Sequence, residues 1–213
     1  MLSSAVSTLW AEERALERAF SAMNAGNWED ALRLAESDGA VARDIIEWHL
    51  LRAGQGTAQE ALVFLERNWD WPGLPYLRKQ SEVALSEAND QTILTYFENS
   101  APQTGAGALA YALALLRDGQ DDKSSLVAQN AWITLPLTAH QQDAFLSAFG
   151  SVLMPLHEIR LIEMLWMDEH GSAQQMQTLV GADLSALLRA RIALRKGQKG
   201  VTALINAVPN ALG

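Results

Sequence analysis

The residues of this chain best suited to chemistry are acidic side chains next to histidines. Asp168, Glu169 and His170 are consecutive, and a carboxyl group beside an imidazole can transfer protons. A carboxyl group that cleaves a glycosidic bond must keep its proton near neutral pH, which requires a dry or apolar pocket. These three residues instead lie between Met167, which ends an apolar helical run, and Gly171. We therefore expect a solvated turn here.

The other histidines also favour structural roles. His157, Glu158 and Glu163 lie one, five and six residues apart, and these spacings do not place all three side chains on one helix face. No metal site is predicted from them, and His157 is expected to be capped or at the edge of the core. His49 lies in an apolar segment and is predicted to be a satisfied buried ring, whereas His140 is expected in the first turn of a helix.

Motifs for nucleophilic catalysis and phosphate binding are missing. The sequence contains no cysteine, which excludes thiolate nucleophiles, disulfides and cysteine-based zinc sites. It contains neither a Gly-x-Ser-x-Gly elbow nor a Gly-x-Gly-x-x-Gly loop. The segment Gly105–Gly107 comes closest and is interpreted as a closely packed start of a helix. We expect no catalytic residue, no metal and no cofactor in these 213 residues.

Tryptophan side chains are the remaining candidates, because an aromatic face can stack on a sugar ring. Trp69 and Trp71 flank Asp70 in a proline-rich break, where we expect them to be partly exposed. They are the only residues predicted to contact glycan, and packing of this turn between two helical pairs is the alternative. Four other tryptophans follow apolar helical stripes and are predicted to lie in the core, namely Trp28, Trp48, Trp132 and Trp166.

One local pattern organises the chain: an alanine-rich helix, a turn of glycine and polar residues, and another such helix. It recurs at Gly26–Asn27, Gly54–Thr57 and Gly119–Asp122. Glycine just past the last apolar residue can adopt the left-handed conformation that ends a helix. The Asn, Thr or Asp that follows can cap the next helix. Recurrent helical hairpins without a strand signal predict an all-α superhelix, a TPR-like α-solenoid of stacked antiparallel helical hairpins.

Apolar residues recur with helical periodicity along the whole chain. The breaks Trp71–Pro75 and Ala101–Gly105 are too short for a flexible linker, so residues 1–213 are expected to form a single domain. About twelve or thirteen helices are predicted, over residues 6–25, 28–37, 41–53, 58–69, 76–86, 91–99, 105–117, 123–135, 139–149, 155–167, 172–180, 184–196 and 201–207. Pro75 and Thr104 are predicted at helix starts.

Charge and hydropathy restrict the partners. The net charge of −9 argues against nucleic acid, whose phosphates require a basic surface. No run approaches the roughly 20 apolar residues of a membrane span. The end of the chain is basic, because Asp183 is the only acidic residue after Gly181, against Arg189, Arg191, Arg195, Lys196 and Lys199. These cations favour either a helix C-terminus or an interface with an acidic segment further along a longer chain.

Several short segments occur in a fixed order over two thirds of the chain. They include Trp71–Arg78, Pro102–Ala110, Phe145–Gly150 and Ala190–Leu194, and the series closes at Val208–Pro209. In this order, residues 69–211 resemble the superhelical N-terminal region of the proteobacterial soluble lytic murein transglycosylases.

The resemblance implies a periplasmic enzyme whose export signal has been removed. Members of this family cleave the β-1,4 bond between N-acetylmuramic acid and N-acetylglucosamine of peptidoglycan and form 1,6-anhydromuramoyl products. Their catalytic unit is a separate C-terminal lysozyme-like domain, in which a Glu-Ser motif is followed by Gly-Leu-Met-Gln. This combination does not occur here. We therefore expect a U-shaped helical domain that is truncated before the catalytic domain.

Two functions follow as expectations. The first is a non-catalytic helical scaffold of a lytic transglycosylase, with its own C-terminal catalytic domain and peptidoglycan strands as partners. The alternative is a TPR-like adaptor without enzymatic activity that binds a peptide or a protein in a concave groove. Both functions are compatible with alanine-rich helices joined by glycine-containing turns.

Overall fold

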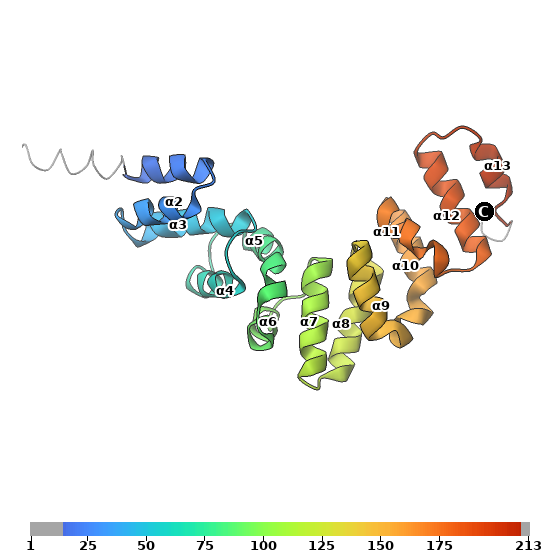
Figure 1. Cartoon of the computed structure of the whole chain (residues 1–213), viewed down its shortest axis with the longest axis horizontal. Coiled ribbons are helices and arrows are strands. Elements are labelled where there is room, and N and C mark those ends of the chain that lie inside the picture. The colour runs from blue at the N-terminus through green and yellow to red at the C-terminus, as the bar shows by residue number, and fades with distance from the viewer. Residues whose placement is uncertain (1–14, 210–213) are drawn as a thin grey trace, which may run out of the picture. The chain divides into compact units, whose positions relative to one another are not determined.

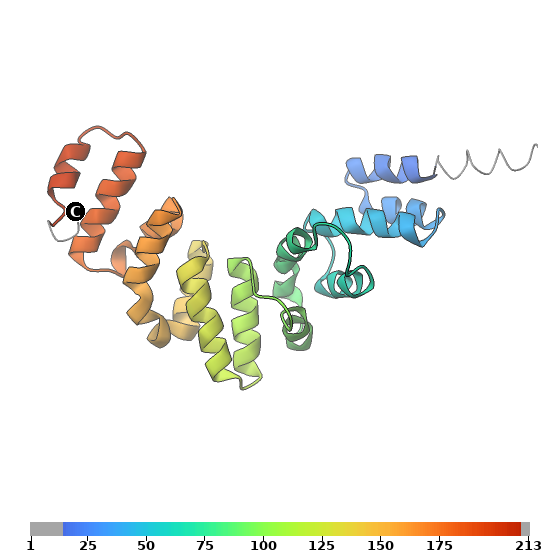
Figure 2. The same cartoon turned by 180° about the vertical axis from the view of Figure 1, so that it is seen from behind.

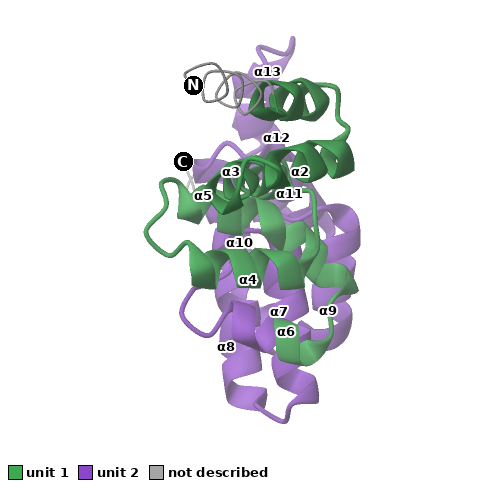
Figure 3. Ribbon diagram, turned by 90° about the vertical axis from the view of Figure 1, so that its left-hand side faces the viewer, with its two compact units in different colours: residues 1–92 green, residues 93–213 purple. Residues whose placement is uncertain are grey.

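The computed structural model of the chain describes residues 15–209. Every regular element in this range is helical (Figures 1 and 2), which confirms the predicted all-α class. Contacts divide the chain into two compact units, residues 1–92 and 93–213 (Figure 3). The division falls within α6 (Asp90–Tyr96). The expectation of one continuous domain stays a prediction.

Unit 1 contains a helical stretch at residues 15–24 and four further α-helices. These are α2 (Trp28–Glu36), α3 (Ala40–Arg52), α4 (Ala58–Arg67) and α5 (Leu74–Ser81), followed by a 3-10 helix at Glu82–Glu87. Helix α3 is central, because α2, α4 and α5 all pack against it. A cluster of small side chains around Ile46 allows α2 and α3 to approach closely.

Unit 2 contains seven complete α-helices among its described residues. They are α7 (Gly105–Arg117), α8 (Asp121–Thr134), α9 (Ala139–Leu153), α10 (His157–Trp166), α11 (His170–Gln175), α12 (Ala182–Arg195) and α13 (Val201–Asn206). Helix α9 packs on both α7 and α8, α10 packs on α8, and α12 contacts α10 and α11. Most contacts in this unit therefore join elements that are close along the chain.

The predicted turn chemistry is confirmed in part. The three turn glycines adopt positive φ angles, with +80° at Gly26, +70° at Gly54 and +75° at Gly119. Caps were predicted less well. The Thr57 side chain accepts a hydrogen bond from the Glu60 amide in a capping box, whereas the Asn27 side chain caps nothing. The predicted aspartate caps are also wrong, since Asp121 and Asp122 lie in the first turn of α8.

A buried arginine holds the end of α8. Arg160 of α10 is 0% exposed, and its guanidinium carbon lies 4.7 Å from the centroid of the fully buried Trp132 ring. Its Nη1 donates to the carbonyl oxygens of Trp132 and Leu135. Burial lowers the pKa of Arg160 to about 10, so the side chain still carries its charge at neutral pH. A cation at this position complements the free carbonyls and the dipole of a helix C-terminus.

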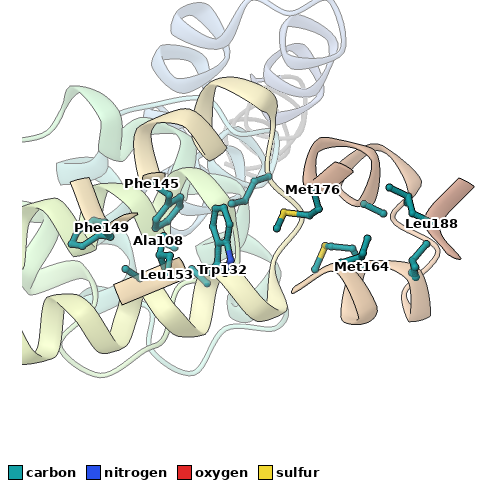
Figure 4. Packing of buried hydrophobic residues seen from close by; sticks show 14 of the residues in the cluster. Ala108, Trp132, Phe145, Phe149, Leu153, Met164, Met176 and Leu188 are labelled. Atoms are coloured by element: carbon teal, nitrogen blue, oxygen red, sulfur yellow. The ribbon is translucent and has the colours of Figure 1, made fainter. Parts of the chain in front are cut away.

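The segment Leu135–Thr138, which we call the α8–α9 corner, is also held by α11. The Ser172 hydroxyl accepts a hydrogen bond from the Leu137 amide at 3.2 Å and donates to the Leu137 carbonyl at 3.3 Å. Gln175 Nε2 donates to the same carbonyl at 3.4 Å. Around the corner, Trp132, Phe145 and Met176 belong to one apolar cluster (Figure 4). Side chains of α10 and α11 thus fix the path between α8 and α9.

The described residues include one helical stretch, Ala139–Trp166, with the length and composition of a membrane-crossing helix. A 3-10 turn at Met154–Leu156 interrupts it, which agrees with the prediction of two separate helices, over 139–149 and 155–167, although the first helix continues to Leu153. Phe149 on one side of this turn and Leu161 on the other are both buried in the core of unit 2. Core packing accounts for only part of its apolar composition, because 28% of its most apolar 18-residue window is buried.

The tight approach of α7 to the α8–α9 corner gives a stability prediction. A Cβ atom on Gly105 would lie 2.5 Å from Leu137 Cδ2, 2.8 Å from Gln141 Oε1 and 3.2 Å from the Pro136 carbonyl. We expect Gly105→Ala to lower the free energy of unfolding by about 1–3 kcal/mol because the contact becomes overpacked. The measurement is urea-induced unfolding followed by circular dichroism.

Gly150→Ala is the matched control. Gly150 lies inside α9, and a Cβ atom there would meet nothing within 4 Å. Alanine should therefore raise the free energy of unfolding by about 0.5–1 kcal/mol through helix propensity. Equal effects of the two substitutions would show that Gly105 is not a packing position.

Candidate functional site

The two tryptophans predicted to contact glycan lie in the loop between α4 and α5, and the structure gives them different surroundings. Trp69 is 77% exposed and makes no ring contact with any described residue. Trp71 is partly buried, and its ring packs edge-on against Phe64 with a centroid distance of 5.6 Å. Trp69 is therefore free to stack on a ligand, whereas Trp71 fulfils the packing role that was the alternative.

An arginine between two aromatic rings holds this loop. The Arg52 guanidinium carbon lies 4.2 Å from the centroid of the Trp48 ring and 4.9 Å from that of Tyr76. The Trp48 indole N–H donates to the Pro72 carbonyl at 3.1 Å. Gly73 has φ +71°, and a Cβ atom there would lie 2.4 Å from Arg52 Nη1. The loop that carries Trp69 thus packs closely on α3.

Arg52 was not predicted to hold this loop, although the sequence carries a local signal for it. Trp48 and Arg52 are four residues apart on α3, which is the spacing at which helical side chains meet. An arginine beside a tryptophan at this spacing favours a cation–π contact. The third member, Tyr76, comes from α5 and has no local signal.

His49 packs against aromatic side chains but is only partly buried, so the predicted burial of its ring is wrong. Its ring centroid lies 6.1 Å from that of Phe20 and 4.9 Å from that of Trp48. Burial, and secondly the positive charge of Arg52, lower the pKa of His49. The neutral imidazole is therefore the form that this packing favours.

The acidic cluster at Asp168–His170 forms the predicted turn. Asp168 has φ +57° and is the only residue other than glycine with a positive φ among the described residues. Its carboxylate lies 3.1 Å from Arg195 Nη2 and 4.0 Å from His170 Nε2, and its side chain is 48% exposed. A solvated, ion-paired carboxylate lacks the dry pocket that a glycosidase acid requires.

The remaining polar candidates also have structural partners. His157 is the first residue of α10. The centroid of its ring lies 5.5 Å from that of Trp132, which agrees with the predicted position of His157 at the edge of the core. No three His, Asp or Glu side chains in the described part of the chain could hold a metal ion.

The chain's only Glu-Ser pair is Glu36-Ser37. There, Glu36 is 65% exposed and pairs with Arg43, and the Ser37 hydroxyl donates to a backbone carbonyl.

The prediction for the tryptophans in helical stripes is only partly correct. Trp132 is fully buried, but Trp28 and Trp48 are partly exposed. Trp166 is 69% exposed, and the Arg191 guanidinium carbon lies 4.6 Å from its ring centroid. The prediction fails for Trp166 because this residue is the last of α10, where the Arg191 side chain of α12 lies over its ring but leaves most of the side chain exposed.

A groove in unit 2 was not predicted. It has a volume of about 480 Å³ and lies between the segment 97–102 and the α7–α8 hairpin. Phe97 and Tyr111 are almost fully buried beneath it, and Lys123 Nζ lies 5.5 Å from the Tyr111 ring centroid. Asn99 and Asn130 are exposed along it, and their side chains make no hydrogen bond with described residues. An amide side chain offers both donor and acceptor groups.

Comparison with known proteins gave no match to a family model, to a curated protein or to a solved structure.

The environment of His49 predicts a pH dependence of stability. The pKa of His49 is lowered in the folded state, so between that pKa and about 6.5 the unfolded chain binds more protons. Stability is therefore fully present above about pH 6.5 and decreases as the pH falls through this window. We expect the midpoint temperature of thermal unfolding to change less between about pH 7 and about pH 5 in His49→Gln than in the wild type.

His140→Gln serves as the control, because His140 is exposed in the first turn of α9. It should retain the pH dependence of the wild type. If His49→Gln also retains it, the desolvated imidazole is not responsible.

Proposed function

We propose that this chain is a non-catalytic helical scaffold of a peptidoglycan lytic transglycosylase, as its resemblance to that family implies. The observation that carries the proposal is the distribution of contacts. Within each unit, helices pack mainly on elements near them in sequence. The acidic clusters lie in solvated turns and ion pairs. Such an arrangement presents surface and supports neighbouring parts without bringing reactive groups together.

We further infer that the helices form a TPR-like superhelix of stacked hairpins. The left-handed glycines at the turns and the close α7–α8 packing support this arrangement. In the proposal, the catalytic domain belongs to the same parent protein, and the setting is the periplasm. That domain would cleave the MurNAc–GlcNAc bond.

Trp69 is the proposed point of contact with glycan strands. Its side chain is exposed to solvent. The loop that carries it packs on Trp48 and Arg52 of α3. A loop that is already held in place loses little conformational entropy when a ligand binds.

A specific observation favours the second candidate, a peptide-binding adaptor. In the groove beside α7 and α8, the rings of Phe97 and Tyr111 are only 3% and 5% exposed, so neither offers a face to a sugar. The exposed amides of Asn99 and Asn130 match the donor and acceptor groups of a peptide backbone. An extended peptide suits this groove better than a glycan does.

The test of the glycan contact is co-sedimentation of the purified chain with insoluble peptidoglycan. We expect the wild type to be retained and Trp69→Ala to lose at least about fivefold in retention, since one stacked aromatic ring contributes roughly 1 kcal/mol or more. Trp166→Ala is the matched control because Trp166 is similarly exposed, at 69%, and lies in the other unit. It should bind like the wild type.

Two outcomes would contradict this role. Absence of wild-type retention would exclude glycan binding by this chain, and equal losses in the two variants would exclude a specific role of Trp69. The adaptor function is favoured instead if an immobilised library of extended peptides captures the wild type but not Asn130→Ala.

A further inference from the structure

The last helical pair of unit 2 has an apolar surface that no other part of residues 15–209 covers. Helix α13 contains Val201, Leu204 and Ile205, yet none of its residues is buried. Ile205 is 46% exposed, and Leu194 on the neighbouring α12 is 59% exposed. Exposed apolar side chains that cluster in this way mark interaction surfaces more often than isolated ones do.

Leu194 and Ile205 line a groove, which we call the α12–α13 groove, with a volume of about 890 Å³. Helix α12 contributes Leu187, Ala190 and Leu194 to its lining. Helix α13 contributes Ile205, and the segment after α13 contributes Val208 and Pro209. Its polar lining consists of Arg191 and Asn206. The interior of the groove therefore suits an apolar surface, with polar contacts at its edges.

The packing of unit 2 shows what fits between two such helices. Helix α9 packs on both members of the α7–α8 hairpin, and α12 contacts both α10 and α11. By contrast, α13 contacts α12 and no other helix extensively within the described residues. An apolar groove between two helices accepts the ridge of side chains of a third helix.

The charge around the groove selects the kind of helix. Residues 181–209 carry five cationic side chains and one acidic one. Arg195 pairs with Asp168 and Arg191 stacks on Trp166. Lys196 and Lys199 are exposed and form no ion pair with any described residue. Both lysines lie in the turn that joins α12 to α13, so this end of the groove has a positive excess that acidic side chains would neutralise.

We propose that the α12–α13 groove binds an amphipathic helix of another protein, with an apolar face and acidic flanks. The apolar face packs on Leu194 and Ile205, and the flanking carboxylates face Lys196 and Lys199. This is a helix-in-groove interface. It goes beyond the proposed function and does not depend on whether the chain binds glycan.

The test uses the full chain and two labelled peptides in fluorescence polarisation. The probe is a designed helix of about 18 residues with leucines at i, i+3, i+4 and i+7 and glutamates beside them. The matched peptide carries lysines in place of the glutamates. We expect saturable binding of the acidic peptide, at least about tenfold tighter than that of the basic one. Its affinity should fall as salt is raised from about 50 mM to about 500 mM.

Variants locate the site. Ile205→Asp should weaken binding of the acidic peptide at least about tenfold, because it places a carboxylate in the apolar contact. Val41→Asp is the matched control, since Val41 is 70% exposed in unit 1, and it should bind like the wild type. A double substitution, Lys196→Glu with Lys199→Glu, should weaken the acidic peptide about three- to tenfold and strengthen the basic one. Circular dichroism verifies that each variant is folded.

Several results would overturn the proposal. They are equal affinities for the two peptides, an unchanged affinity of Ile205→Asp, or an equal loss in Val41→Asp. Sedimentation equilibrium supplies a further check. A dimer that Ile205→Asp dissociates would show that a second copy of the chain, and not an acidic partner helix, occupies the groove.

Discussion

Unit 2 depends on a positive charge buried in its core. Placing the Arg160 guanidinium away from water is costly, and two of its nitrogens, Nε and Nη2, have no hydrogen-bond partner in the described part of the chain. The cost is offset by the carbonyls of Trp132 and Leu135 and by the face of the Trp132 ring. The arginine thereby links α10 to the end of α8 and fixes where α8 stops.

The position of the α8–α9 corner determines much of the remaining packing in unit 2. Ser172 and Gln175 bind the backbone of Leu137, which joins α11 to the same point. Gly105 lets the start of α7 approach it closely. Leu135 of this corner also lines the groove beside α7 and α8, whereas the α12–α13 groove and Trp69 lie away from the corner.

Much of the helical framework could be predicted from sequence because its signals are local. A glycine after an apolar run can end a helix whatever the surrounding tertiary structure is. Gly26, Gly54 and Gly119 all follow helices and adopt positive φ angles. The proline-rich break correctly indicated an exposed Trp69. Helical periodicity alone wrongly predicted that Trp166 is buried in the core. An apolar stripe along a helix does not show how far along that helix a neighbouring helix covers it.

Long-range contacts account for most of what could not be predicted. Arg160 follows an ordinary helical pattern in α10, and nothing local distinguishes a buried arginine from a solvated one. Its partners, Trp132 in α8 and Leu135 just after it, lie 28 and 25 residues away. The groove beside α7 and α8 likewise requires the segment 97–102 to fold against a hairpin. Such features depend on tertiary packing, which single-sequence patterns do not encode.

Native-state hydrogen exchange of Arg160→Met, compared with the wild type, tests most directly whether this buried arginine organises unit 2. Methionine keeps an apolar stem but removes the hydrogen bonds to the end of α8. We predict faster amide exchange over α8, α9, α10 and α11, while α2, α3 and α4 of unit 1 exchange as in the wild type. Faster exchange confined to the last turn of α8, with the rest of unit 2 unchanged, would contradict this account.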